Sequence, residues 1–398
     1  MSIPLRARTP TGAELVALAE RLACELAPAA AEHDNDATFP FESVAALHDA
    51  RYFAAPVPCE LGGLGVESLH DLVVASSRLA RGDASLTIGV NMHLAVLANV
   101  VGRWRRATSS GDVRRAAAFG ETLAEVVHDG LVIATAISEA GQDLSRPATT
   151  ATRTPTGWRV DGRKIFCTMS PAATVLYTAV TFLDHEGGER YGYARVPAAA
   201  PGVVVHGDWD GLGMRSSGSH TVTFDGVELP ASALRGGFPI GHDAGYMEAN
   251  LNAGLFHAAA SLGIAESAHD AATAAIAGRE LDARAQMLVA ETAIALAAAR
   301  ATLSRAALLA DEHLDGSPEA LEDVFAEAQA AKTFINETAV RIVDLSLALA
   351  GGAAYRAGHP IARAYRDVRA GAFMHPLGAN RAYELVGQVS LGLEASLR

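Results

Sequence analysis

The beginning of the chain carries the apolar spacing of an amphipathic helix. Leucines recur every three or four positions, and so fall on one face of a helix, at Leu15, Leu18, Leu22 and Leu26. Thr11 and Glu14 precede all four leucines and have the spacing of a capping box. Helical spacing continues to about residue 125 and is interrupted by the glycine-rich run VPCELGGLGVES at 57–68. We therefore predict an N-terminal helical domain over residues 1–128.

The pattern changes to short runs rich in β-branched and aromatic residues between about residues 131 and 235. The runs GWRV, RKIF, TVLYTAVTF and HTVTF have the length and composition of strands. They are separated by Asp161-Gly162, Gly187-Gly188 and Asp225-Gly226. Because Asp-Gly is a strong hairpin sequence, we expect turns at these pairs. The segment 129–238 is predicted to be a small β-barrel or β-sandwich domain.

Alanine-rich helical spacing returns after Gly241, with long periodic runs at about 255–310 and 318–350. Ser317 and Pro318 suit the start of the second run, and Gly351-Gly352 suits its end. We predict a C-terminal four-helix bundle over residues 239–398, and hence a mainly α fold with a central β domain. A ligand is expected where the β domain meets the two helical layers, because domain junctions supply concave apolar sites.

The composition narrows the range of partners. The 398 residues are 50% hydrophobic, enough for a sizeable core, and the formal net charge of -13 disfavours nucleic acid or an anionic membrane as the main partner. Cys24, Cys59 and Cys167 form neither a disulfide framework nor a C-x-x-C spacing, which fits a reducing, cytoplasmic compartment. No metal-ligand motif and no G-x-S-x-G motif appears, so metalloenzyme and hydrolase classes are set aside. A small molecule is the expected partner.

Four stretches carry the candidate chemistry, and their order matters more than any one of them. They are ATAISEAGQD at 134–143, GWRVDGRKIFCTMSPAATVLYTAV at 157–180, DGLGMRSSGSHTVTFDGVELPASAL at 210–234 and LALAGGAAYRAGHPIARAYRDVRAGAFMHP at 347–376. In this order they resemble segments of the acyl-CoA dehydrogenase superfamily over nearly the whole chain. The resemblance implies the three-part fold predicted above, a bound flavin, and a homotetramer or homodimer formed through the C-terminal bundle.

The resemblance also implies which residues hold the flavin ring. Phe166 stands where the family has a tryptophan, and an aromatic side chain there can pack on the isoalloxazine. Thr168 matches a threonine that hydrogen-bonds near the N5 atom. Ser138 and Glu139 match the start of the family segment that passes beneath the ring, and Ile137 and Ser138 are the residues of this segment expected to bind the flavin.

The implied cofactor is FAD, with FMN as the alternative. Gly351 and Gly352 match a glycine pair that approaches the pyrophosphate of a neighbouring subunit's FAD, where a Cβ atom would block the approach. The family's R-x-x-F, which grips the adenine, has no clear counterpart in AGRELDARAQ at 277–286. The resemblance therefore supports tight FAD binding less strongly than it supports the fold.

The family's catalytic glutamate is missing. In the fourth stretch this glutamate and the following glycine become His375 and Pro376, and the second family position of the base falls at Ala253. Dehydrogenation needs a carboxylate to remove the Cα proton while hydride passes to the flavin. The two-component monooxygenases of the superfamily, such as the dibenzothiophene and the aminosugar or amine N-hydroxylating enzymes, also lack this glutamate and take reduced flavin from a separate reductase.

We therefore expect a flavin-dependent monooxygenase that uses reduced flavin and O2 to hydroxylate or N-oxygenate a small organic substrate, with a flavin reductase as partner. The expected catalytic residues are His375, at the family's base position, and His93, on a helix that reaches the flavin from the other side. One alternative is an acyl-CoA or acyl-carrier-protein dehydrogenase whose base is His375 or an unrecognised carboxylate. Another is a catalytically silent homologue.

Overall fold

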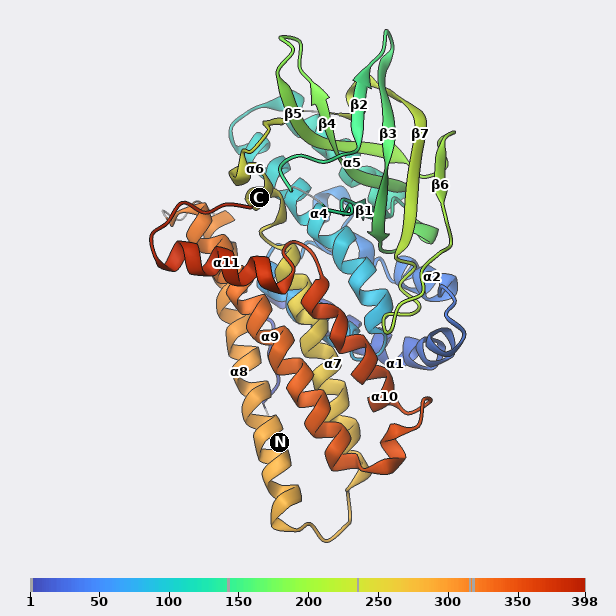
Figure 1. Cartoon of the computed structure of the whole chain (residues 1–398), viewed down its shortest axis with the longest axis vertical. Coiled ribbons are helices and arrows are strands. Elements are labelled where there is room, and N and C mark those ends of the chain that lie inside the picture. The colour runs from blue at the N-terminus through green and yellow to red at the C-terminus, as the bar shows by residue number, and fades with distance from the viewer. Residues whose placement is uncertain (1–2, 142–143, 235, 315, 317–318, 398) are drawn as a thin grey trace.

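The computed structural model describes residues 3–141, 144–234, 236–314, 316 and 319–397. Figure 1 shows an elongated molecule with the sheet domain at one end, the long C-terminal helices at the other, and the N-terminal helices behind their junction. This is the mainly α fold with a central β domain that the sequence predicted. The N-terminal helices, the sheet domain and the C-terminal helices meet at one junction, and the candidate site lies there.

The N-terminal layer contains α1 (Pro10–Asp36), α2 (Phe41–Asp49), α3 (Leu69–Leu79), α4 (Ala84–Ser109) and α5 (Val113–His128). The predicted apolar face of α1 is buried at Leu15, Leu22 and Leu26. The capping-box prediction was wrong by two residues, because the N-cap is Thr9, whose hydroxyl accepts the Gly12 N–H. Thr9 is held in this role by a second hydrogen bond of 2.6 Å from its hydroxyl to Asp71 of α3.

The α4 helix is the core helix of the junction. Asp83 caps it by accepting the Leu86 N–H at 2.9 Å, and its first half is almost continuously buried. It packs against β1 of the sheet domain and against α7 of the bundle. Both α4 and α8 are long and apolar enough to cross a membrane by length and composition, but 78% of the apolar window of α4 is buried inside the protein.

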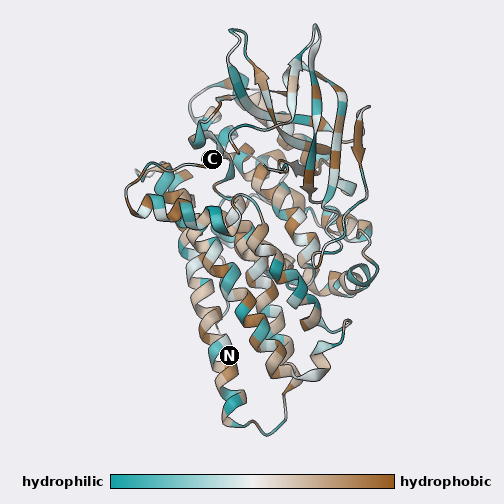
Figure 2. Ribbon diagram, viewed as in Figure 1, coloured by the Kyte–Doolittle hydropathy of each residue, from teal (hydrophilic) through white to brown (hydrophobic). Residues whose placement is uncertain are grey.

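The sheet domain is one mixed sheet in the order β6-β7-β3-β2-β4-β5-β8, with β1 paired in parallel to β4. Its strands are β1 (Ile133–Ala136), β2 (Thr150–Arg153), β3 (Gly157–Cys167), β4 (Val175–Leu183), β5 (Glu189–Pro197), β6 (Val203–Val205), β7 (His220–Pro230) and β8 (Phe238–Pro239). Figure 2 shows teal and brown residues alternating along the strands, as expected for a sheet with one face in a core. Trp158, Val160 and Phe224 lie in that core.

Two of the three predicted turns are not turns. Gly187-Gly188 does connect β4 and β5, but Asp161-Gly162 lies inside β3 and Asp225-Gly226 lies inside β7. The ladder between these two strands shifts register at Val160/Gly162, so the extra residue forms a bulge rather than a hairpin. Gly226 has φ +61, and its N–H is bound by the Asp161 carboxylate at 2.8 Å. The two Asp-Gly pairs therefore stabilise each other's irregular backbone across the ladder.

The C-terminal part contains α6 (Asp243–Asn250), α7 (Ala253–Ala275), α8 (Ala283–Leu314), α9 (Leu321–Ala350), α10 (Pro360–Asp367) and α11 (Ala379–Ser390). Figure 1 shows α7, α8, α9 and α10 side by side as a bundle. Gly351, with φ +79, ends α9 as predicted. Ser317 and Pro318, predicted to start this helix, lie outside the described residues. The short helical segment Val368–Phe373 leads from α10 to the loop that carries His375.

Candidate active site

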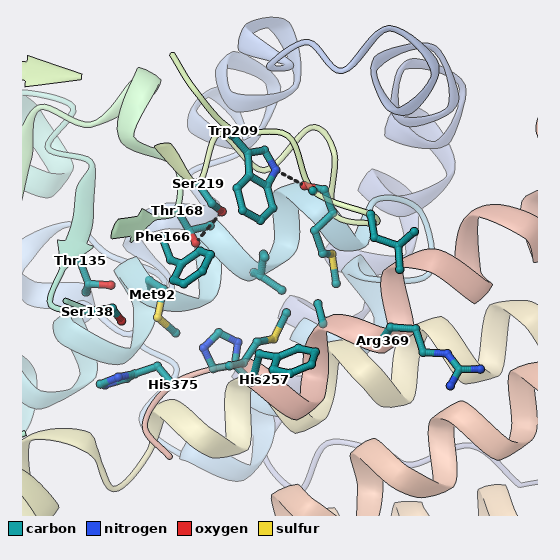
Figure 3. A pocket seen from close by; sticks show the side chains of 18 of the residues that line it. Met92, Thr135, Ser138, Phe166, Thr168, Trp209, Ser219, His257, Arg369 and His375 are labelled. Atoms are coloured by element: carbon teal, nitrogen blue, oxygen red, sulfur yellow. Dashed lines mark hydrogen bonds between the residues drawn. The ribbon is translucent and has the colours of Figure 1, made fainter. Parts of the chain in front are cut away.

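A cavity of about 270 Å³, called the central cavity below, lies where the sheet domain meets α4, α7 and the segment after α10. Figure 3 shows Phe166, Thr168, Trp209 and Ser219 from the sheet domain on one side and His257 and His375 from the helical part on the other. Five residues predicted from the sequence line it together, namely Ile137, Ser138, Phe166, Thr168 and His375. Its size is close to the lower end of small-molecule sites, which is about 300 Å³.

A bulge in β3 directs Phe166 into this cavity. The ladder between β3 and β7 shifts register between Lys164 and Cys167, and Phe166 has φ +56. Such a conformation is unfavourable for a side chain with a Cβ atom, and strained residues of this kind cluster at active sites and ligand clamps. The Phe166 ring is 60% exposed although it is large and apolar. An exposed aromatic ring held in a strained backbone suits a site that a flat ligand covers.

Polar groups border the aromatic wall. The Thr168 hydroxyl lies 2.9 Å from the Ser219 hydroxyl, which in turn lies 2.7 Å from that of Ser217. The Thr168 N–H donates to Phe166 O at 2.9 Å and closes the tight turn that follows the bulge. Hydroxyl groups on a fixed turn can donate to or accept from the polar edge of a bound ring.

A buried ion pair fixes the segment that carries Ile137 and Ser138. The Lys164 ammonium donates to Glu139 Oε1 at 2.6 Å and to Ile137 O at 3.3 Å, and the Ile165 N–H donates to Ser138 O at 2.9 Å. Burial raises the pKa of Glu139, but the charge and hydrogen bond of Lys164, together with hydrogen bonds from Thr149 and Ala148, outweigh burial, and the pKa of this carboxyl is lowered overall. The pair therefore orders the strand-to-loop transition at the cavity floor rather than supplying a free acid.

A loop of the sheet domain closes the cavity against α10. The Met214 N–H donates to Asp367 Oδ1 at 2.6 Å, and burial raises the pKa of this carboxyl to about 7. A Cβ atom on Gly213 would lie 2.3 Å from the backbone of Arg366, so only glycine allows this contact. Trp209, at the start of the loop, forms an edge-to-face pair with Phe166, with 6.1 Å between ring centroids.

His375 lines the central cavity and is held by its neighbours in one orientation. Its Nε2 lies 2.6 Å from Asn250 Oδ1, while Asn250 Nδ2 donates to Tyr246 O at 2.8 Å. Because the Asn250 amide must present its oxygen to the ring, Nε2 carries the proton and Nδ1 carries the lone pair. Burial, together with the nearby charge of Lys332, lowers the pKa of His375 to about 3. This residue is a neutral hydrogen-bond acceptor at Nδ1 over the whole physiological range.

Lys332 of α9 holds the loop on both sides of His375. Its ammonium donates to Met374 O and, at 2.6 Å, to Leu377 O, and the side chain is only 2% exposed. Burial lowers its pKa to about 7, while the two carbonyl oxygens favour the charged form. Lys332 was not identified from the sequence, although a lysine among the apolar positions of a helix is an unusual residue there.

His257 of α7 is a second histidine that the sequence analysis missed. It lines the central cavity and is 4% exposed, and its Nδ1 is buried without a hydrogen-bond partner among the described residues. Burial, with smaller contributions from Lys332 and His375, lowers its pKa well below the usual value. The only sequence indication was a polar residue in the otherwise apolar run AGLFHAAA.

His93 does not line the central cavity. Its Nε2 lies 3.0 Å from Phe53 O, and its Nδ1 accepts the Ile133 N–H at 3.1 Å. The side chain is completely buried, and burial lowers its pKa to about 4. Both ring nitrogens thus serve to join the loop after α2 to β1. These contacts support a structural role for His93. None of them supports the predicted catalytic role.

The glycine pair of the fourth stretch lies apart from the cavity. Gly351 and Gly352 follow the end of α9 that lies farthest from the sheet domain, and neither lines the central cavity. No side chain or backbone atom of the described residues lies within 4 Å of where their Cβ atoms would be. Their role in binding the FAD of a neighbouring subunit remains a prediction. Positions 142–143, at the end of the ATAISEAGQD segment, lie outside the described residues.

Neither family position of the catalytic base holds a carboxylate. His375 occupies the first, and Ala253 and Gly254 at the second are buried. A Cβ atom on Gly254 would lie 3.2 Å from Gln329 and 3.3 Å from Pro376. Among the described residues that line the central cavity, none is aspartate or glutamate.

The lining fits a flavin ring. Phe166 and Trp209 offer aromatic surfaces to the faces of a flat heterocycle, and the hydroxyls of Ser138 and Thr168 offer hydrogen bonds to its edge. Covering the exposed Phe166 ring would remove apolar surface from water, which stabilises the complex. These residues, with the Trp209 loop, would hold the ring.

In this structure, a cavity with aromatic walls is enclosed where helices meet a sheet domain. This is the arrangement of flavin-binding oxidoreductases that are built from three domains. Residues 11–106, 134–227 and 255–376 match the N-terminal, middle and C-terminal domains of acyl-CoA dehydrogenase, respectively. The chain belongs to the acyl-CoA dehydrogenase family.

Its relatives include nitrososynthases. The chain is 34% identical to L-evernosamine nitrososynthase of Micromonospora sp., covering 97% of this chain and 92% of the relative. It is 33% identical to an amino sugar nitrososynthase of Streptomyces peucetius, covering 97% and 95%. A solved structure of KijD3 in complex with FMN and dTDP-3-amino-2,3,6-trideoxy-4-keto-3-methyl-D-glucose superposes with a TM-score of 0.89 at 32% identity, covering 98% of this chain and 96% of that one. The chain is a flavin-dependent monooxygenase of this superfamily, as the sequence predicted.

Proposed function

We propose that the protein N-oxygenates a primary amine on a small, sugar-like substrate, with FMN as the flavin. The observation that carries the proposal is the neutral His375 at the position where dehydrogenases of the family keep an acid, in a cavity whose described lining contains no carboxylate. Support for the substrate and for FMN comes from the nitrososynthase relatives and from the FMN and amino sugar bound by KijD3.

A site without carboxylates favours the unprotonated form of the amine, which is the form that reacts. An amine attacks an electrophilic oxygen through its lone pair, so it must be unprotonated. Lys332 lies behind His375, whereas Arg366 and Arg369, which line the cavity, are each paired with a carboxylate outside it, Asp34 and Asp344. Nearby positive charge and burial both lower the pKa of a bound amine, and no described acid in the lining offsets them.

His375 positions this amine rather than deprotonating it. With a pKa of about 3, the ring is protonated in roughly one molecule in ten thousand at pH 7, so it is a poor proton acceptor but a good hydrogen-bond acceptor. Nδ1 accepts an N–H of the neutral amine and orients its lone pair. When reduced flavin is bound, it supplies the two electrons with which O2 transfers one oxygen atom to nitrogen and releases the other as water. A first round gives a hydroxylamine, and a second round on the same nitrogen gives a nitroso group after loss of water.

The dehydrogenase alternative lacks its base. Removal of a Cα proton from an acyl thioester needs an ionised group of suitable basicity, and His375 is held below that range by burial. Under anaerobic conditions, acyl-CoA thioesters are therefore expected to leave oxidised flavin unbleached on this protein.

The test supplies reduced FMN or FAD, O2 and a panel of amines, and follows the product by mass. A gain of one oxygen atom on an amine, with FMN supporting at least the rate of FAD, is expected. Quantitative loss of O2 as hydrogen peroxide with every amine would contradict the proposal and favour a silent homologue. Bleaching of flavin by a thioester would support the dehydrogenase hypothesis instead.

We also propose a partner, a compartment and an oligomeric state for the protein. A separate flavin reductase would supply reduced flavin, and the protein would be located in the cytoplasm. Met287 and Ile294 of α8 and Phe334 of α9 are large apolar side chains exposed by 64%, 71% and 43%, which favours a homodimer or homotetramer that covers them. Light scattering of the purified protein measures that assembly.

A further inference from the structure

His257 is the second imidazole of the central cavity. It comes from α7 and lines the cavity together with Phe166 and His375. Figure 3 shows its ring pointing from α7 into the cavity, toward the side on which Phe166 lies. The proposed function has the amine at His375 and the flavin ring against Phe166. His257 therefore faces the space through which an oxygen atom would pass from one to the other.

Only one ring nitrogen of His257 can reach a ligand, because Nδ1 is buried. Within the part of the chain that the structure describes, Nδ1 has no hydrogen-bond partner. Proteins leave a buried N–H without an acceptor more rarely than a buried acceptor without a donor, so we assign the proton to Nε2. Burial lowers the pKa of His257 well below its usual value, and the ring is neutral at pH 7. His257 thus presents an uncharged N–H donor to the cavity.

A second buried polar side chain, Gln329 of α9, lies against the same part of α7. Its amide nitrogen would be 3.2 Å from a Cβ atom on Gly254, one turn before His257. Side chains in a helix lean over the preceding turn, which brings the His257 ring toward this position. Gln329 is completely buried, and neither its amide oxygen nor its amide nitrogen bonds to a described residue. Native proteins keep few such unpaired groups, and catalysis is one reason for them.

Oxygen transfer creates negative charge in the space that His257 faces. In each round the O–O bond breaks and an N–O bond forms, and the oxygen atom that is not transferred leaves as water. The two electrons and the two protons of this water come from reduced flavin. Until it is protonated, the leaving oxygen carries a developing negative charge. A fixed donor in a buried site stabilises such charge strongly, because the donor need not reorient during the reaction.

We propose that His257 is a catalytic residue whose Nε2–H donates a hydrogen bond to the oxygen atom that leaves as water. The inference rests on the proposed N-oxygenation for the reaction, but the position of the ring proton is tested on the protein alone. The two histidines then have different tasks. His375 accepts a hydrogen bond from the amine, and His257 donates one to oxygen while keeping its own proton.

The experiment compares His257→Leu and His257→Gln with the wild type as full-length proteins. His257→Leu should lower kcat for amine oxygenation by about 100-fold, the usual effect of removing one such donor, while KM for the amine and the affinity for FMN change little. His257→Gln should recover part of kcat, because its amide N–H reaches about as far as Nε2. His269→Gln is the matched control on the same helix and should keep the wild-type kcat, since His269 bonds to Thr292 at 2.9 Å and does not line the cavity.

Two measurements without turnover separate a catalytic histidine from a structural one. His257→Leu should resist urea at least as well as the wild type, because an apolar side chain replaces a buried group that lacks a partner. Nitrogen-15 NMR of the selectively labelled protein, without flavin, should show a neutral His257 with its proton on Nε2. A proton on Nδ1 would overturn the inference, because the donor would then point away from the cavity.

The outcomes also separate this inference from the proposed function. Oxygenation of an amine by His257→Leu at the wild-type rate, or equal rates in His257→Leu and His257→Gln, would sink the donor and leave N-oxygenation standing. Failure of the wild type to oxygenate any amine would refute the proposed reaction instead. In that case a ring proton on Nε2 supports a donor that faces the cavity, and a ring proton on Nδ1 excludes it.

Discussion

His375 donates its Nε2–H to Asn250 Oδ1 over 2.6 Å, and this contact determines which ring nitrogen of the imidazole is available for chemistry. A dehydrogenase base must be an anion that takes up a proton, whereas a ring tied in this way and buried beside Lys332 stays neutral. The contact also ties the loop after α10 to α6, so the residue at the family's base position is held by two layers of the fold.

The protonation state of His375 can be observed directly. Its folded pKa of about 3 lies below the pH range 5–8, so its ring should not titrate there, and its nitrogen shifts should be those of a neutral ring with the proton on Nε2. Nitrogen-15 NMR of the selectively labelled protein measures this. A midpoint between pH 6 and 7 would show that the ring is not desolvated as described.

Replacement of His375 separates an acceptor from a base. His375→Ala should reduce turnover to background, because the amine loses its hydrogen-bond partner, while His375→Gln should keep a measurable rate through its amide oxygen. His375→Glu should also lose most activity at pH 7, since a carboxylate holds the amine as ammonium. The exposed His185→Ala is the control and should retain full activity. Full turnover in His375→Ala would remove the residue from the mechanism.

Lys332→Met tests whether a residue outside the cavity positions His375. Loss of the bonds to Met374 O and Leu377 O should speed hydrogen exchange at 374–378 and lower kcat about tenfold or more. The pKa of His375 should rise, because a nearby positive charge is removed. Stability should change little, as two hydrogen bonds of about 1 kcal/mol each are offset by no longer burying a charge. Arg341→Met, exposed on the same helix, should leave all three readouts unchanged.

Phe166→Ala tests the aromatic wall. The ring is exposed in the protein alone, so its loss should barely affect unfolding, but FMN should bind roughly 5- to 30-fold more weakly as stacking and apolar contact are lost. Phe41→Ala, 58% exposed on α2, is the matched control. Flavin fluorescence quenching gives both affinities, and unchanged binding in Phe166→Ala would place the ring elsewhere.

His93→Gln distinguishes structure from catalysis through pH. The unfolded imidazole binds a proton near pH 6.5 and the folded one only near pH 4, so the unfolded state binds more protons between these values and the stability that neutral His93 provides is lost as pH falls through this window. The loss amounts to roughly 3 kcal/mol. The wild type should therefore lose stability in acid more steeply than His93→Gln in urea unfolding, while turnover per folded molecule stays within about twofold. A large loss of turnover in a stable His93→Gln protein would restore the catalytic hypothesis.

The periodicity of apolar residues determined the three-part fold, since helix and strand spacing are local properties that each segment carries in itself. The order of short motifs likewise placed Phe166, Thr168 and His375 around one flavin, and the structure brings all three to one cavity. The sequence also showed that an acid was missing, because the absence of a residue type is visible without coordinates.

Only the tertiary structure decided what the histidines and the buried lysine do. His93 takes its partners from Phe53 and Ile133, each 40 positions away, so its sequence neighbours say nothing of its role. Lys332 meets the His375 loop across 42 and 45 positions, and the Asp-Gly pairs became bulges only because β3 and β7 lie side by side. Local spacing fixes the elements, but the partner that satisfies a polar group, and the burial that shifts its pKa, arise only when distant segments pack together.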